Sequence, residues 1–116
     1  MYDLEQFKVK LLKIYSDETL HDDYKKNWSK SNPTYGQCVV TALLIQELFG
    51  GEIYKLEKEN HYYNLIDGEV VDLTKEQFDY PLNYNGGIMR TKAFDEATML
   101  RYEKLKKLLN ISNSLR

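Results

Sequence analysis

The sequence predicts an α+β fold in which a central, cysteine-bearing helix packs on a small antiparallel sheet, flanked by N-terminal and C-terminal helices. Three observations predict it. A run near the middle of the chain is apolar nearly all round, two runs of strand-forming residues flank a tight-turn dipeptide, and both ends carry apolar residues at helical spacing. With 116 residues the chain suits one core, so we interpret residues 1–116 as a single domain.

The two flanking helices are expected over about residues 3–16 and 96–110. In the first, apolar side chains recur at spacings of three and four, and in the second, four leucines lie among charged residues: Leu100, Leu105, Leu108 and Leu109. A second short helix over about residues 17–28 is compatible with the mixed sequence there.

The central helix is expected over about residues 37–49, because this segment is apolar on nearly every side. Gly50-Gly51 ends it, and a strand is expected over residues 52–56. One helical turn is expected at residues 75–77 and a short strand at 88–90.

A β-hairpin is expected from strands at residues 61–66 and 69–73, joined by Asp67-Gly68. This dipeptide favours a two-residue type I′ turn, which fixes the register of the two strands. Counting back from the turn pairs Tyr63 with Asp72 and His61 with Thr74. His61 and Asp72 are then diagonal neighbours on one face, a separation that a hydrogen bond between their side chains can close.

Composition and charge exclude several function classes. The net charge of −2 offers no basic field for nucleic acid, and we expect no nucleic-acid partner. The N-terminus lacks the pattern of a signal peptide, and no apolar run approaches the length of a membrane span, so we expect a cytoplasmic protein without a membrane partner. The single cysteine fits a reducing compartment.

The motif with the most chemical content is Tyr35-Gly36-Gln37-Cys38, which leads into the central helix. A thiol at a helix start ionises easily, because unpaired amide N–H groups and the helix dipole both favour an anion there. The hairpin supplies a base, His61, and a carboxylate, Asp72. These three residues predict a catalytic triad for acyl transfer through a thioester.

The same motifs resemble known families. Tyr-Gly-Gln-Cys before an apolar helix, a His followed by Asn on a strand, and Asp-Leu-Thr on the next strand resemble the core of transglutaminase-like and papain-like cysteine enzymes. The stretch from Trp28 to Phe78, with Gly50-Gly51-Glu52-Ile53 and the segment 72–78, resembles the small bacterial YunG-like family.

The resemblance to the cysteine enzymes implies Cys38 as nucleophile, His61 as general base and Asp72 as orienting group. It implies a papain-like or transglutaminase-like core as well. The chain departs from transglutaminases at Val39, where they usually carry an aromatic residue, and in its small size, which leaves no room for their accessory domains or calcium sites.

An oxyanion formed during attack needs hydrogen-bond donors. The backbone N–H of Cys38 is the first. The candidates for a second donor or for the substrate cleft are Gln37, Trp28, Tyr35 and Asn64, and the sequence does not choose among them. Three tyrosines are further candidates for lining a cleft, although ordinary core and rim packing explains them as well: Tyr80, Tyr84 and Tyr102.

These residues predict a thiol-dependent hydrolase or acyltransferase acting on an amide, isopeptide or ester bond of a peptide or small substrate. The alternative is an inactive binding or regulatory module on the same fold. Cys38 also fits a small buried core residue, His61 a satisfied surface or core histidine, and Asp72 a cap of the turn before residues 75–77. Together the three residues also fit a metal site. We expect no metal and no cofactor. The sequence indicates neither the substrate nor the oligomeric state.

Overall fold

The computed structural model describes residues 4–15, 19, 28–29 and 36–109, and everything said of the structure concerns these residues. The helix expected over residues 17–28 lies almost wholly outside them. Within them the order of elements is α1 (Leu4–Ile14), α3 (Cys38–Phe49), β1 (Glu52–Leu56), β2 (His61–Ile66), β3 (Glu69–Val71), β4 (Ile88–Met89) and α4 (Glu96–Leu108). Single 3₁₀ turns occupy Lys75–Gln77 and Tyr84–Gly86.

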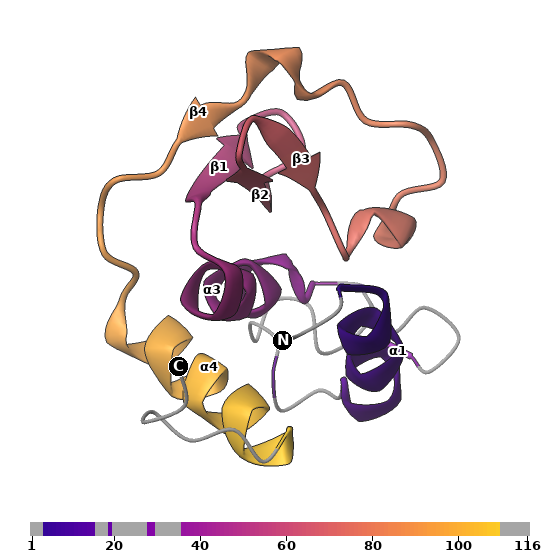
Figure 1. The fold of residues 1–116 in the computed structure, drawn as a ribbon, viewed down its shortest axis with the longest axis vertical. Helices are drawn as coiled ribbons and strands as arrows, with labels where there is room; N and C mark the ends of the chain where they lie inside the picture. The colour runs from indigo at the N-terminus through magenta and orange to yellow at the C-terminus, as the bar shows by residue number, and fades with distance from the viewer. Residues whose placement is uncertain (1–3, 16–18, 20–27, 30–35, 110–116) are drawn as a thin grey trace.

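The strands form a four-stranded sheet in the order β3-β2-β1-β4, with every neighbouring pair antiparallel. Helix α3 packs against β2 and β1, so the sheet lies over the central helix (Figure 1). The predicted α+β architecture is therefore confirmed at this level. The segment after β3 runs in a wide arc around the sheet before it reaches α4 (Figure 1).

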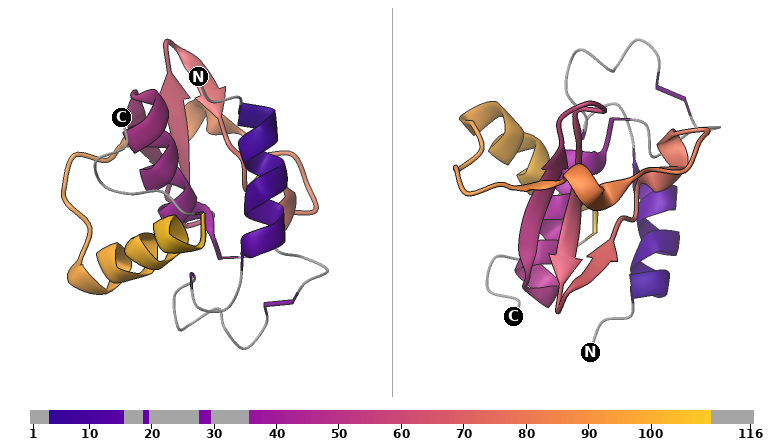
Figure 2. Two further views of the ribbon diagram at one scale, coloured as in Figure 1. Left: turned by 60° about the horizontal axis from the view of Figure 1, so that its bottom comes forward. Right: turned by 90° about the horizontal axis from the view of Figure 1, so that it is seen from above.

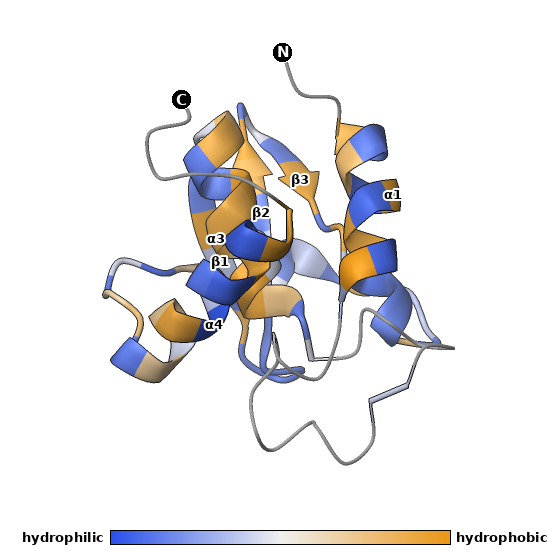
Figure 3. Ribbon diagram, turned by 90° about the horizontal axis from the view of Figure 1, so that it is seen from below, coloured by the Kyte–Doolittle hydropathy of each residue, from blue (hydrophilic) through white to orange (hydrophobic). Residues whose placement is uncertain are grey.

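Helix α3 lies between α1 and α4, which flank it on two sides (Figure 2). The ring of Phe7 in α1 meets that of Phe49 in α3 edge-on, with centroids 5.9 Å apart. Figure 3 shows hydrophobic and hydrophilic residues alternating along α1, as expected of a helix with one buried face. No helix in the described ranges is long and apolar enough to cross a membrane. The core that joins the three helices consists of Leu11, Tyr15, Val40, Leu44, Tyr102 and Leu105.

The β2–β3 hairpin has the predicted turn. Asp67 and Gly68 have φ angles of 51° and 81°, the positive values that a type I′ turn requires at both positions. The ladder pairs Ile66 with Glu69 and continues to Asn64 opposite Val71, in the predicted register.

The hairpin is shorter than predicted, because β3 ends at Val71 instead of residue 73. The expected ladder pairs of Asp72 and Thr74 with β2 are therefore wrong. The reason is local: the backbone N–H and the hydroxyl of Thr74 point back to Asp72 Oδ1, at 3.3 and 3.4 Å. This side-chain turn competes with the strand and bends the chain away.

Candidate active site

Cys38 is the first residue of α3, directly after the Gln37 N-cap. Gly36 has a φ of 73°, a left-handed conformation that glycine adopts without strain, and it turns the chain into the helix. The first helical hydrogen bond runs from the Thr41 N–H to the Gln37 carbonyl, at 3.1 Å, so the N–H of Cys38 has no partner inside the helix. The side chain of Cys38 is largely buried, and it lines a cavity.

His61, the first residue of β2, is buried, and its Nε2 donates to Asp72 Oδ2 at 2.7 Å. The ring of Phe78 packs edge-on against the imidazole, with centroids 5.0 Å apart. The diagonal pairing of His61 with Asp72 is therefore present, although Asp72 lies just beyond the strand.

Because Asp72 occupies Nε2, Nδ1 is the nitrogen that remains for the Cys38 thiol. Within the described residues, the buried Nδ1 makes no hydrogen bond of ordinary geometry. Hydrogen bonds between reacting groups are often long or poorly aligned in a free enzyme and tighten when substrate binds.

The carboxylate of Asp72 is held from several directions. Oδ2 accepts from His61 and from the Tyr84 hydroxyl, at 2.7 and 2.8 Å, while Oδ1 accepts from Thr74. The side chain of Asp72 is only 3% exposed. A carboxylate fixed in this way holds the hydrogen-bonded imidazole in one orientation and one tautomer.

The pKa of His61 is raised to about 9. Burial is the largest influence and lowers it, but the hydrogen bond to Asp72, which is the largest raising influence, together with the smaller contribution of nearby Cys38, outweighs burial.

Comparison with known proteins places the chain in a family. Residues 3–113 match the family described as YunG protein. The chain belongs to the YunG family. Over 82 residues it is 42% identical to a Bacillus subtilis (strain 168) protein described as "Uncharacterized protein YunG", covering 68% of this chain and 71% of that protein. No solved structure matches, so the likeness to papain-like and transglutaminase-like cores has no support from this comparison.

The cavity beside Cys38 has a volume of about 690 Å³. In this YunG-family protein the start of α3, the β1–β2 connection and the segment leading into α4 enclose it. Its side chains of most chemical interest are Cys38, Tyr62, Phe78, Arg90, Phe94 and Arg101. A smaller cavity of about 500 Å³ lies beyond Asp72 and is lined by Tyr80 and Tyr84.

The four predicted oxyanion or cleft residues lie in different surroundings. Gln37 is fully buried, and its Oε1 accepts from Thr19 Oγ1 at 2.7 Å. Asn64 donates from Nδ2 to the Ala42 carbonyl at 3.0 Å, which ties β2 to α3. Trp28 packs against the helical core, and Tyr35 lies outside the described residues.

Three features of the site were missed or misjudged by sequence reasoning. Tyr102 is wrong as a cleft residue, because it is buried in the core and bonds Glu47. Tyr84 was expected at a cleft, but nothing in the sequence linked it to Asp72. Arg90 and Arg101 gave no sequence signal, because only the tertiary fold brings them to one cavity. No cluster of three His, Cys, Asp or Glu side chains suited to a metal ion occurs among the residues described.

Proposed function

We propose that this YunG-family protein is a thiol-dependent hydrolase or acyltransferase that cleaves an amide, isopeptide or ester bond through a thioester on Cys38. The observation that carries the proposal is the buried 2.7 Å bond from His61 Nε2 to Asp72 Oδ2, which leaves Nδ1 for the thiol at the start of α3. A nucleophile, a base and a group that orients the base are the parts that such chemistry needs.

The chemistry begins with proton transfer from Cys38 Sγ to His61 Nδ1, which gives a thiolate and an imidazolium. The thiolate attacks the acyl carbon, and the carbonyl π electrons move to oxygen. As the tetrahedral intermediate collapses, the bond to the leaving amine or alcohol breaks, and that group takes the proton from Nδ1. Cys38 then carries the acyl group as a thioester.

The second half-reaction returns the enzyme to its starting state. A water molecule gives a proton to Nδ1 and attacks the thioester carbon, the C–S bond breaks, and an acid is released while the departing sulfur takes the proton back from Nδ1. An amine in place of water gives acyl transfer, and we favour water. Asp72 holds the imidazole for both steps, and the free N–H groups at the start of α3 stabilise the oxyanion. The likeness to papain-like and transglutaminase-like enzymes belongs to this proposal.

The first test measures the alkylation of Cys38 by iodoacetamide between pH 6 and 8. Cys38 is the only cysteine, so any label reports on it. We expect alkylation at pH 6 at least about tenfold faster than that of glutathione, because an ionised thiol is the reactive species. His61→Gln should remove the advantage, and His21→Gln, at the only other histidine, should not.

A second measurement follows acylation directly. An activated ester such as p-nitrophenyl acetate should leave an acetyl group on Cys38, detected by intact mass, in the wild type but not in Cys38→Ser. A thiol that reacts no faster than glutathione and accepts no acyl group would overturn the proposal and favour the inactive binding module.

A further inference from the structure

The cavity beside Cys38 contains two arginines that form no ion pair with any acidic side chain among the described residues. Within the described residues, Arg101 donates to Thr98 Oγ1 at 2.9 Å and forms no ion pair. Arg90 donates to the Tyr62 hydroxyl at 3.0 Å and to two backbone carbonyls, all of them uncharged. Both guanidinium groups therefore keep a full positive charge and unused N–H donors at the cavity wall.

Among the described residues, two acidic side chains line the same cavity, and each has another partner. Asp95 caps α4 by accepting from the Thr98 N–H at 2.9 Å. Glu59 interacts with the hydroxyl of Tyr80, and this interaction raises the pKa of Tyr80 together with burial, the largest cause. Among the described residues, neither carboxylate forms an ion pair with Arg90 or Arg101, so both guanidinium groups remain available to a ligand.

Arg90 is fixed in place before any ligand arrives. Its backbone N–H donates to the Ile53 carbonyl at 2.7 Å, which extends the pairing of β4 with β1. Its guanidinium lies 4.2 Å from the ring centroid of Phe94 and 5.8 Å from that of Tyr62. A planar guanidinium packed against two aromatic rings is preorganised to bind a carboxylate.

We propose that the cavity selects substrates that carry a carboxylate near the acyl group, with Arg101 and Arg90 binding the carboxylate and Cys38 placed at the acyl carbon. This inference rests on the proposed thiol chemistry and names its substrate class. Phe78, Phe94 and Val39 on the same walls provide apolar surface for the carbon chain between the two groups. An acidic peptide or an amide of a dicarboxylic acid has this chemistry.

The test compares two alkylating agents that differ in charge. Iodoacetate carries a carboxylate, whereas iodoacetamide is neutral, and both react with the same sulfur. The ratio of their rates should be higher for Cys38 than for glutathione. Arg101→Gln should lower this ratio by about three- to tenfold, the effect of removing one nearby charge in a partly solvated site.

Two variants control for fold and net charge. Arg101→Lys keeps the charge and should keep most of the ratio. Lys107→Gln removes one positive charge from an exposed position of the same helix that does not line the cavity, and it should leave the ratio unchanged. Glutarate should slow alkylation by iodoacetamide in the wild type, and uncharged glutaramide should not.

The outcomes separate the two proposals. Fast alkylation by iodoacetamide with a rate ratio that Arg101→Gln does not change would overturn the carboxylate inference and leave the thiol chemistry standing. Equal protection by glutarate and glutaramide would overturn it as well. Alkylation by both agents at the glutathione rates would overturn the thiol chemistry, and the substrate class with it.

Discussion

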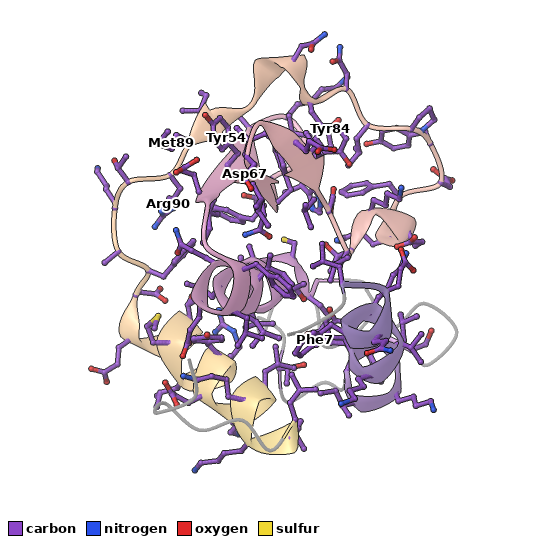
Figure 4. The ribbon with its side chains drawn as sticks, in the orientation of Figure 1. Phe7, Tyr54, Asp67, Tyr84, Met89 and Arg90 are labelled. Atoms are coloured by element: carbon purple, nitrogen blue, oxygen red, sulfur yellow. The ribbon has the colours of Figure 1, made fainter. Side chains whose placement is uncertain are left out.

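The β2–β3 hairpin and the connection over residues 78–95 both reach the site, but they are held in different ways. The hairpin is fixed by a continuous ladder and a tight turn, and it places buried His61 beside Asp72. The connection contains a two-residue strand and one 3₁₀ turn, and most of its residues are exposed. It contributes single side chains: Tyr84 beside β3 and Arg90 beyond β4 (Figure 4).

Because they are held differently, the hairpin and the connection contribute differently to the site. Backbone pairing in the hairpin sets the geometry that the thiol chemistry requires. The connection adds one hydroxyl bond to Asp72 and places Arg90 at the cavity that we propose as the substrate site. Changes at His61 or Asp72 should therefore abolish reactivity, whereas changes in the connection should alter it by small factors.

The largest effect is expected from Asp72→Asn. The amide keeps the shape of the side chain but loses the charge that orients His61, and the equivalent change in a serine triad costs about 10⁴-fold in rate. We expect ester hydrolysis to fall by about 10²- to 10⁴-fold, measured with p-nitrophenyl acetate. Asp67→Asn makes the same chemical change in the exposed turn of the hairpin and should leave the rate of ester hydrolysis unchanged. Equal activity of the wild type and the Asp72→Asn variant would show that Asp72 has no role in the reaction.

The second prediction concerns pH. Because the pKa of His61 is about 9 in the folded protein and 6.5 ordinarily, its charged form stabilises the fold fully below pH 6.5. That contribution is lost as the pH rises from 6.5 through about 9. The free energy of unfolding, measured with urea, should fall over this window relative to His61→Gln, by at most about 3 kcal/mol at 1.36 kcal/mol per unit.

Two neighbouring groups, Asp72 and Cys38, raise the pKa of His61 and so cause this pH dependence. Hydrogen bonding to Asp72 raises the pKa of His61 more than that to Cys38. The Cys38→Ser variant should therefore keep most of the fall in unfolding free energy as the pH rises. A difference between wild type and His61→Gln that does not change between pH 6 and 10 would contradict the raised pKa.

The same comparison shows what the sequence could predict. The hairpin follows local rules: Asp67-Gly68 sets the turn and the turn sets the register, so the approach of His61 to Asp72 was predictable. The end of β3 was not, because the Thr74 bonds to Asp72 compete with the ladder. Helices with a regular apolar period were placed to within two residues of both ends.

The connection could not be predicted in the same way. Its irregular backbone follows no period, and its important contacts join residues distant in sequence. Tyr84 meets Asp72, and Arg90 meets Tyr62, only after the sheet has formed. The cavity likewise exists only where α4 approaches the start of α3. Long-range packing therefore determines the substrate side of the site.

The third prediction tests the connection itself. Tyr84→Phe removes one of the donors to Asp72 Oδ2 and leaves His61 and Thr74 in place. Burial, and then Asp72, raise the pKa of Tyr84 above its ordinary value, so the hydroxyl remains a donor throughout the neutral range. We expect a loss of about 1–2 kcal/mol in unfolding free energy, measured with urea, and a severalfold slower alkylation of Cys38.

The control for Tyr84→Phe is Tyr80→Phe. Tyr80 lies in the same connection, is half exposed and has no bond to Asp72. If Tyr80→Phe lowers the unfolding free energy and the alkylation rate of Cys38 as much as Tyr84→Phe does, Tyr84 has no specific role in positioning Asp72.

The smallest effect should come from neighbouring glycines beside Tyr84. A Cβ at Gly87 would lie 1.8 Å from the Tyr63 hydroxyl, whereas one at Gly86 would meet no atom within 4 Å. Tyr63 packs edge-on against Tyr84, with centroids 4.8 Å apart, so Gly87→Ala should displace both rings. The alkylation rate of Cys38 should then drop by no more than in Tyr84→Phe, because both changes act through the same hydroxyl. Gly86→Ala should match the wild type, and a larger loss from Gly87→Ala than from Tyr84→Phe would mean that the connection positions more of the site than Asp72 alone.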